Sequence, residues 1–156
     1  MLVQDIMTTS VRTAMARQPV REPALVMCFH KISGLPVVDT DNRIVGVLSE
    51  KDVLRAMYPD LHECMQDRHI DLEKLELGYR DVLGMPVGEV MSARVVTVSP
   101  RDPVLKAVST MCAHSIRRVP VAVDGRLVGI VSVGDVHKAL FQQNLTTPEA
   151  RHASAG

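Results

Sequence analysis

The sequence predicts a mixed α/β fold (α+β), in which small sheets pack with helices. Three observations lead to this prediction. The chain of 156 residues contains two copies of one pattern, each copy reads as strand, helix, hairpin and helix, and the apolar residues are mostly aliphatic, with two Tyr, two Phe and no Trp. A three-stranded sheet with one covered face is barely stable alone, so we expect the two copies to pack together.

The internal repeat is the strongest signal in the sequence. Residues 3–38 align with residues 87–122 without a gap, and 13 of these 36 positions are identical. After one residue is dropped from the second copy, a further seven of 15 positions match, up to residues 55 and 138. The predicted organisation is a first repeat over 1–57, an acidic, helical connector over 58–86, a second repeat over 87–141 and a polar, frayed tail over 142–156.

The second copy shows the first strand and the first helix most clearly. Residues 95–98 are Val-Val-Thr-Val, which predicts a short strand. Asp102 followed by Pro103 predicts a helix start, with Asp as the N-cap and Pro as the first helical residue. In the first copy, Pro23 would break a helix that began at Pro19. We therefore expect that helix to start near Arg21.

A hairpin and a second helix complete each copy. Residues 119–123 and 127–131 are apolar runs of strand length on either side of Asp124-Gly125, and Asp-Gly is a favoured two-residue turn. Pro120 cannot donate to a ladder, so its strand should lie at an edge or beside a gap. The second helix is expected to begin at Ser132.

The connector carries seven acidic residues against three basic ones. Its apolar residues recur at helical spacing from Leu72 to Leu83, with Asp71 as the expected N-cap. We expect a helix that covers the flank of the fold. The alternatives are a dimer or partner surface, or a lid over a binding site.

Composition excludes several classes of function. The 18 Lys and Arg balance the 18 Asp and Glu, so the chain lacks the overall positive charge of proteins that bind nucleic acid or membrane surfaces. No apolar run approaches the roughly 20 residues of a membrane span. The N-terminus shows no secretory signal, so we expect a cytoplasmic protein without membrane insertion. Three cysteines are too few for a disulfide framework.

Each copy ends in the pattern Gly-hydrophobic-x-Ser-x-x-Asp, at residues 46–52 and 129–135. The other informative stretches are Asp5-Ile6-Met7, Glu89-Val90-Met91, Thr97-Val98-Ser99-Pro100, Gly34-Leu35-Pro36-Val37-Val38-Asp39 and Arg117-Arg118-Val119-Pro120-Val121. Together with the repeated pattern, these stretches resemble a tandem pair of cystathionine β-synthase (CBS) domains, the Bateman module. The resemblance implies pseudo-two-fold symmetry, clefts between the repeats, a disc-shaped homodimer, and a module that binds adenosine-containing ligands and regulates another protein.

The two Ser-x-x-Asp motifs, Ser49 with Asp52 and Ser132 with Asp135, have two interpretations. One is a capping box, although Asp is shorter than the usual Glu or Gln and we expect it to close such a box poorly. The other is nucleotide binding, since a carboxylate accepts the vicinal hydroxyls of a ribose and a helix N-terminus suits a phosphate. The resemblance implies ribose binding by the two Asp and phosphate binding by the two Ser. Two copies in phase favour binding.

The remaining candidate ligand residues follow from the same resemblance. Thr13 and Thr97 lie on the first strand of each copy, where a hydroxyl faces phosphate or ribose, although a β-branched residue is also simply a good strand former. Arg117 and Arg118 would clamp a phosphate, and the first copy has the uncharged Ser33-Gly34 instead, so we expect unequal sites. The residues expected to contact adenine are Leu35, Pro36, Val119 and Pro120.

Two Cys-x-His sequences, at 28–30 and 112–114, raise the possibility of a metal site. Residues two apart on a helix point about 200° apart, so neither pair chelates one ion easily. We expect each Cys to pack as a small apolar residue and each His to lie near a helix end. His62, Cys64 and His69 form a still weaker cluster, and no metal is predicted.

The sequence therefore predicts a regulatory module that binds AMP, ADP or ATP, requires no cofactor, and signals to an enzyme or transporter. Magnesium would accompany only a triphosphate. One alternative is a structural or dimerisation module with empty clefts. Another is a sensor of S-adenosylmethionine, whose sulfonium would not need Arg117 or Arg118. No catalytic residues are predicted, because no nucleophile, acid–base pair or metal constellation stands out.

Overall fold

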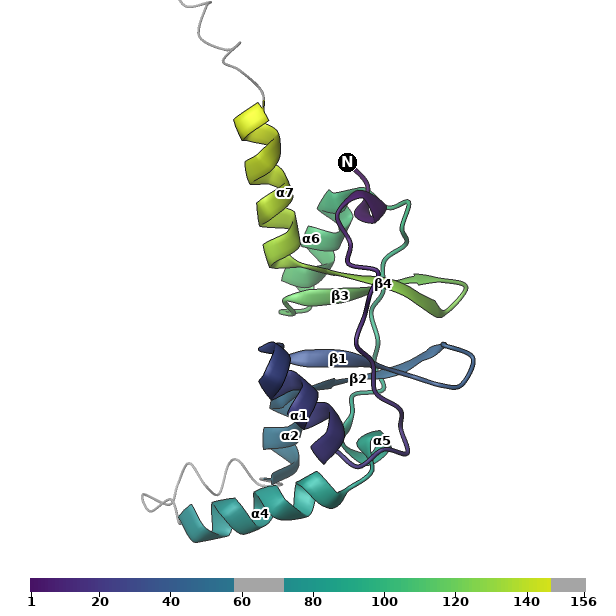
Figure 1. The fold of residues 1–156 in the computed structure, drawn as a ribbon. Coiled ribbons are helices and arrows are strands. Elements are labelled where there is room, and N and C mark those ends of the chain that lie inside the picture. Colours follow the sequence, from purple (N-terminus) through teal and green to yellow (C-terminus); the bar gives the residue numbers. More distant parts are fainter. Residues whose placement is uncertain (58–71, 147–156) are drawn as a thin grey trace, which may run out of the picture. The chain divides into compact units, whose positions relative to one another are not determined.

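Two strand pairs form the sheets of the fold (Figure 1). The computed structural model describes residues 1–57 and 72–146. Strand β1 (Gly34–Val38) pairs antiparallel with β2 (Ile44–Ser49), and β3 (Arg118–Val123) pairs with β4 (Arg126–Ser132). Asp124 and Gly125 turn the second pair with φ angles of 50° and 78°. Two successive positive φ angles characterise the type I′ turn, so the turn predicted from Asp-Gly is confirmed.

The strand predicted over residues 95–98 is wrong, because only its last residue pairs. The Val98 N–H donates to the Pro120 carbonyl at 3.1 Å, and the Ala122 N–H donates to the Val98 carbonyl at 2.9 Å. Extending this parallel pairing toward residue 96 would require a donor from the backbone nitrogen of Pro120, which has no hydrogen. In the first repeat, Ala14 makes the same single bridge to Val37.

The helices follow the repeated pattern, with one addition from the connector. They are α1 (Arg21–His30), α2 (Glu50–Met57), α4 (Leu72–Gly84), α5 (Val87–Val90), α6 (Val104–Ala113) and α7 (Val133–Thr146), together with a short 3-10 turn, η1 (Val3–Asp5). The frayed tail predicted from residue 142 is wrong for residues 142–146, which continue α7; residues 147–156 lie outside the described part of the chain. No helix among the described residues has the length and apolar character needed to cross a bilayer.

The starts of the first helices depart from the sequence prediction in one repeat only. In the first repeat, α1 begins at Arg21 as predicted, and Pro23 lies in its first turn, where a missing N–H breaks no helical hydrogen bond. In the second repeat, the N-cap of α6 is Pro103 and not Asp102. The Asp102 carboxylate instead accepts hydrogen bonds from the Ser99 N–H at 2.8 Å and from Lys106 Nζ at 2.9 Å.

The chain divides into two compact units, each with its own core. The first-repeat unit comprises Arg12–Val95 and Gly125–Leu127, and the second-repeat unit comprises Met1–Val11, Val96–Asp124 and Val128–Gly156. The N-terminal segment of each repeat therefore belongs to the unit built mainly from the other repeat. Val3 is fully buried in the core of the second-repeat unit, and Val87, its counterpart in the alignment, is fully buried in the core of the first-repeat unit.

Repeated glycines allow these exchanged segments to approach the hairpins. In the first-repeat unit, Val47 and Ser92 exchange two backbone hydrogen bonds of 2.9 Å next to Gly46. In the second-repeat unit, Thr8 and Ile130 do the same next to Gly129, also at 2.9 Å. A side chain on either glycine would meet the exchanged segment, so the close approach of the two backbones requires Gly at both positions.

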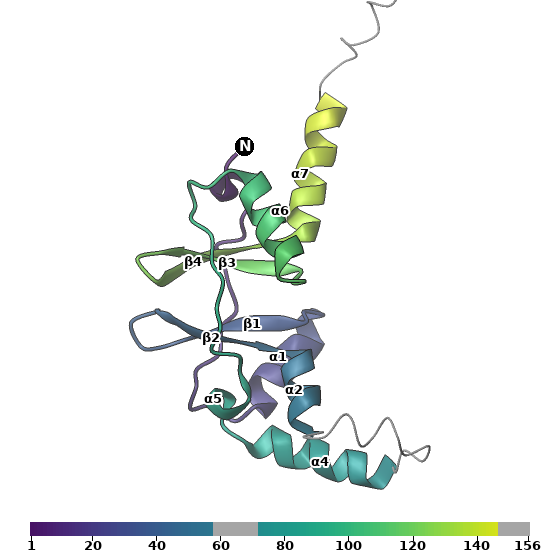
Figure 2. The same cartoon turned by 180° about the vertical axis from the view of Figure 1, so that it is seen from behind.

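Helix α4 extends the first-repeat unit. It lies across the ends of α1 and α2, as the view from behind also shows (Figure 2). Val82 is buried in the core of this unit, and Leu83 packs against that core. The helix predicted in the connector is thus present and lies on the flank of its unit. Asp71, its expected N-cap, lies outside the described residues.

The contacts of Asp102 predict a dependence of stability on pH. The Ser99 backbone N–H, and then the Lys106 ammonium, lower the pKa of Asp102 below its ordinary value. Its contribution to stability is present above the pKa of the unfolded chain and is lost as pH falls toward the lower pKa of the folded chain. We expect Asp102→Asn to lower the melting temperature at about pH 6, and the difference from wild type to shrink at about pH 3. Asp81→Asn, on the exposed surface of α4, is the control, and a difference independent of pH would contradict the assignment.

Candidate functional site

The Ser-x-x-Asp motif of each repeat closes a capping box at the start of the helix after the hairpin. Asp52 Oδ2 accepts hydrogen bonds from the Ser49 N–H at 2.8 Å and the Ser49 hydroxyl at 2.7 Å, and Ser49 Oγ accepts one from the Asp52 N–H at 3.3 Å. The corresponding distances between Ser132 and Asp135 are 2.8, 2.6 and 3.2 Å. The expectation that Asp closes this box poorly is therefore wrong, because its carboxylate reaches the Ser backbone N–H at 2.8 Å in both repeats and also accepts the Ser hydroxyl.

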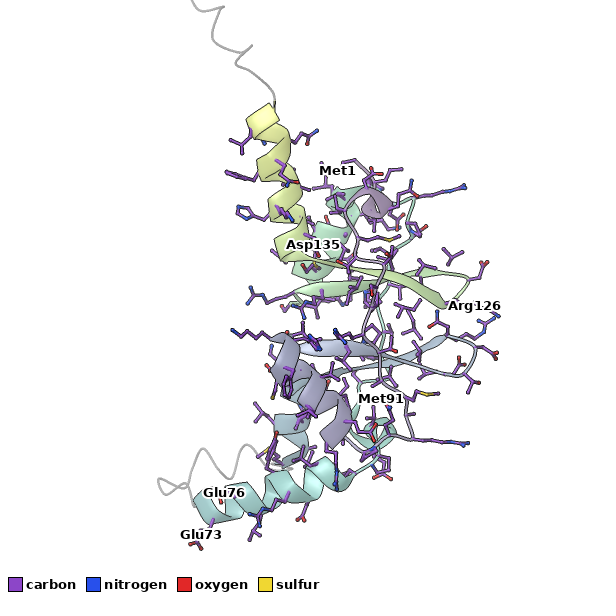
Figure 3. All side chains as sticks on the ribbon, viewed as in Figure 1. Met1, Glu73, Glu76, Met91, Arg126 and Asp135 are labelled. Carbon is purple, nitrogen blue, oxygen red and sulfur yellow. The ribbon has the colours of Figure 1, made fainter. Side chains whose placement is uncertain are left out.

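Each capping box uses Oδ2 of the Asp carboxylate, so Oδ1 takes no part in the capping hydrogen bonds. In the first repeat, Arg55 Nη1 lies 3.7 Å from Asp52 Oδ1. In the second repeat, no described residue pairs with Oδ1 of Asp135, which lies where β4 passes into α7 (Figure 3). Capping and ligand binding are thus compatible, because the box fixes the carboxylate and leaves one oxygen as an acceptor.

The first N–H group of each helix is already bonded. The Glu50 N–H donates to the Ser33 carbonyl, and the Val133 N–H donates to the Arg117 carbonyl, both at 3.0 Å. The third N–H group, that of Asp52 or Asp135, donates to the Ser hydroxyl of the capping box. Of the first three N–H groups, only the second, that of Lys51 or Gly134, is therefore available to an anion. The bonds of the first N–H groups hold the residue that precedes the hairpin directly beside the capping box.

The two repeats differ in charge at these positions. Arg117 is exposed and Arg118 is half-buried, and neither forms an ion pair with another residue of the described chain. In the first repeat, a Cβ at Gly34 would lie 3.0 Å from the Leu48 carbonyl oxygen. A long cationic side chain does not fit there without a shift of the backbone.

The two threonines lie on extended segments just before the bridges to the hairpins. Thr13 precedes Ala14, and Thr97 precedes Val98, which are the residues that pair with β1 and β3. Both threonine side chains are exposed, so their hydroxyls are accessible to a ligand. Each threonine also belongs to the same compact unit as the capping box of its own repeat.

The four residues expected to contact adenine lie in the interior of the units. Leu35 and Val119 are 1% and 0% exposed and belong to the two hydrophobic cores. The carbonyls of Pro36 and Pro120 accept hydrogen bonds from Ala14 and Val98. Contact between these four residues and a base would therefore depend mainly on the backbone and not on the side chains.

The cysteines and histidines do not gather into a site within the described residues. Cys28 and Cys112 are exposed free thiols, so the expectation that they pack as small apolar residues is wrong. His30 ends α1 and His114 follows α6, as expected for residues near helix ends. No group of three or more potential metal ligands occurs among the described residues. The cluster of His62, Cys64 and His69 lies outside them.

Sequence reasoning overlooked three features of the site. These are the ion pair of Arg55, the carbonyls of residues 33 and 117 that bond the helix starts, and the different residues that follow each Ser. The last feature was readable from the alignment of the two copies, which places Glu50-Lys51 opposite Val133-Gly134. The first two depend on distances that an alignment does not give.

Comparisons with known proteins identify the repeated unit. The family model described as CBS domain matches residues 3–59 and 87–142. The CBS domain-containing protein YhcV of Bacillus subtilis is 36% identical over 134 residues, which cover 86% of this chain and 81% of that protein. The crystal structure of the CBS domain of a CBS domain-containing membrane protein from Sphaerobacter thermophilus is similar with a TM-score of 0.67 and 33% identity, over 88% of this chain and 86% of that one.

Two similar structures contain adenosine compounds. CBSX2, from Arabidopsis thaliana, in complex with AMP is 26% identical with a TM-score of 0.71, covering 92% of this chain and 98% of that one. The CBS domain pair of protein MJ0100 in complex with 5′-methylthioadenosine and S-adenosyl-L-methionine is 26% identical with a TM-score of 0.67, covering 90% and 99%. The likenesses confirm the predicted fold class and the resemblance on which the ligand prediction rests.

Proposed function

Because this chain belongs to the CBS domain family and carries two copies of the domain, we propose that it is a regulatory module that binds adenosine nucleotides (AMP, ADP or ATP) and signals to a partner protein. The module comprises the repeats over 1–57 and 87–141. Ligand binding would change the relative stability of two arrangements of the module, by its different affinity for each.

One observation carries this proposal. Each repeat holds an Asp carboxylate rigidly at a helix start and leaves Oδ1 outside the capping bonds. A fixed carboxylate oxygen of this kind suits the hydroxyls of a ribose, because little side-chain freedom is lost when the bond forms. The likeness of the whole chain to structures that contain AMP or S-adenosylmethionine also supports the proposal.

The roles of the other residues complete the proposal. The hydroxyls of Ser49 and Ser132, the exposed hydroxyls of Thr13 and Thr97, and the guanidinium groups of Arg117 and Arg118 would bind phosphate oxygens. The backbone at Leu35, Pro36, Val119 and Pro120 would recognise adenine. The protein would act without catalysis, as a cytoplasmic homodimer, on an enzyme or transporter, and magnesium would accompany ATP.

Two other functions compete with this proposal. S-adenosylmethionine sensing is supported by the complex of the MJ0100 domain pair, which is similar to this chain. A dimerisation module with empty sites is the second competitor. Exposed apolar side chains on α1 and α2 support self-association, namely Leu25, Phe29 and Leu54.

A thermal-shift titration of the full chain tests the proposed function. A ligand at about 100 times its dissociation constant stabilises a protein by about 2.7 kcal/mol, which raises the melting temperature by roughly 5–10 °C at this chain length. We expect such a shift with AMP, ADP or ATP, and its loss in Asp52→Asn, in Asp135→Asn or in both. Asn keeps the size of the side chain and an acceptor for the capping box.

The control is Asp81→Asn, which removes an exposed carboxylate from α4 and should retain the full shift. A rise in melting temperature with S-adenosylmethionine and with none of the nucleotides would favour S-adenosylmethionine sensing. No shift with any of the four compounds would contradict nucleotide binding and favour the dimerisation module.

A further inference from the structure

Resting on the proposed function, we propose that the two sites bind different classes of adenosine ligand. The site of the second repeat, around Asp135, takes a phosphorylated ligand. The site of the first repeat, around Asp52, takes an adenosine derivative without phosphate. The shared carboxylate would bind ribose in both sites. In the first site, the hydroxyls of Ser49 and Thr13 would then contact an uncharged or cationic 5′ group in place of the phosphate proposed above. The residues around the carboxylate would select between the ligand classes.

The charges beside the two capping boxes differ by two units. The residues that adjoin the box in the second repeat are two cations and two uncharged residues, Arg117, Arg118, Val133 and Gly134. Their counterparts in the first repeat are two uncharged residues, one acid and one base, Ser33, Gly34, Glu50 and Lys51. Among these residues, the excess positive charge lies beside Asp135; Arg55, which pairs with Asp52, has the cationic Lys138 as its counterpart in the second repeat.

The backbone holds the arginines close to the second capping box. The Arg117 carbonyl accepts the N–H of Val133, the residue that follows Ser132, at 3.0 Å. Arg118 is the first residue of β3. Since neither arginine is paired with another described residue, a phosphate could bind both without breaking an existing ion pair. Guanidinium groups bind phosphate through two parallel hydrogen bonds, which makes them strong and selective partners for it.

The first repeat excludes such a phosphate clamp for structural reasons. A Cβ at position 34 would lie 3.0 Å from the Leu48 carbonyl oxygen, so a side chain there requires a shift of the backbone. The exposed Glu50 adjoins Ser49 and would repel a phosphate at the helix start, offsetting the charge of Lys51. Arg55 already lies 3.7 Å from Asp52 Oδ1. The residues around Asp52 therefore suit ribose hydroxyls and a 5′ group that is uncharged or cationic.

Gly134 leaves the second site more open than the first. A Cβ at this position would make only ordinary contact, with Ser132 Oγ at 3.6 Å, so the backbone is not constrained to Gly by its own neighbours. A phosphate can approach the backbone at Gly134 more closely than it can approach the same position in the first repeat, where Lys51 carries a side chain.

Isothermal titration calorimetry of the full chain with AMP and with 5′-methylthioadenosine tests this division. The variant Arg117→Ala with Arg118→Ala should weaken AMP binding by about tenfold or more, the effect of losing one charge-assisted hydrogen bond, and should leave 5′-methylthioadenosine binding unchanged. The matched control, Arg80→Ala with Arg94→Ala, removes two exposed arginines that make no hydrogen bond or ion pair with either capping box, and it should change neither affinity.

Single-site variants assign each ligand to its repeat. Asp135→Asn should remove AMP binding and keep 5′-methylthioadenosine binding, and Asp52→Asn should do the reverse. Ser33→Arg combined with Glu50→Val should add a second AMP site. Equal weakening of both ligands in the arginine variant, or loss of AMP binding in Asp52→Asn, would overturn the division but leave nucleotide binding intact. If the wild-type chain bound neither compound, the division would be overturned, and the proposed function itself would fail only if ADP and ATP did not bind either.

Discussion

Replacing Gly46 with Val is expected to destabilise the protein by about 3 kcal/mol, the upper end of what overpacking a core usually costs. A Cβ at this position would lie 2.5 Å from Met91 Sδ and 3.0 Å from the Ser92 carbonyl oxygen. The Met91 side chain can move, but the Ser92 carbonyl accepts a hydrogen bond from the Val47 N–H at 2.9 Å and cannot move without breaking it. Chemical denaturation of wild type and variant measures the difference in the free energy of unfolding.

Gly84→Ala is the control at a position where a side chain has space, and it is matched to the smaller substitution Gly46→Ala. Nothing lies within 4 Å of a Cβ at Gly84, so the change should alter stability by less than about 1 kcal/mol and in the stabilising direction. Combining Gly46→Ala with Met91→Ala should cost less than the sum of the single changes, because removing the Met side chain relieves part of the clash. A Gly46→Val protein as stable as wild type would show that the exchanged segment does not pack against β2.

Replacing Val3 with Asp should destabilise the second-repeat unit by about 3 kcal/mol. The substitution places a charge in an apolar core or releases the N-terminal segment, and either outcome removes the burial of Val3. Val3 is fully buried, and its N–H donates to the Asp102 carbonyl at 2.9 Å. The effect should appear in the unit formed mainly by the second repeat, although Val3 belongs to the first repeat in sequence.

Hydrogen exchange resolves where the stability is lost. In the Val3→Asp variant, the amides of α6, β3 and β4 should exchange faster, while those of α1, β1 and β2 change less. Gln4→Asp adds the same charge at an exposed neighbouring position and should leave exchange unchanged. Faster exchange confined to α1, β1 and β2 would contradict the placement of the segment.

Local signals predicted those parts of the fold that depend on a few neighbouring residues. The Asp124-Gly125 turn and the start of α1 at Arg21 follow from allowed backbone angles and from the missing N–H of proline, and both are confirmed. The prediction of a strand at residues 95–98 was wrong because the pairing depends on Pro120, a residue distant in sequence. The prediction of Asp102 as an N-cap was wrong because its carboxylate accepts hydrogen bonds from the Ser99 N–H and from Lys106 Nζ instead.

The candidate site shows the same limit. The Ser-x-x-Asp motif predicted the Ser and Asp of each repeat as ligand residues. The alignment of the two copies showed that only the second repeat has the two arginines. Whether an Asp closes the capping box, and which of its oxygens stays outside it, depends on distances of a few tenths of an ångström. Residue spacing does not contain that information, so the role of each oxygen could not be assigned from the motif.

The sequence by itself determined the repeat and the family, because these depend on residue identity and spacing, and the family resemblance suggested the candidate ligands. Only the tertiary structure decided which core each N-terminal segment enters. Val3 and Val87 are the same residue in matching patterns, as are Met7 and Met91, so either segment is apolar enough for either core. Non-local packing decides which core each segment enters, since Met7 packs next to Gly129 and Met91 packs next to Gly46. Two segments with equal local preference can be distinguished only by the contacts that the folded chain allows each to reach.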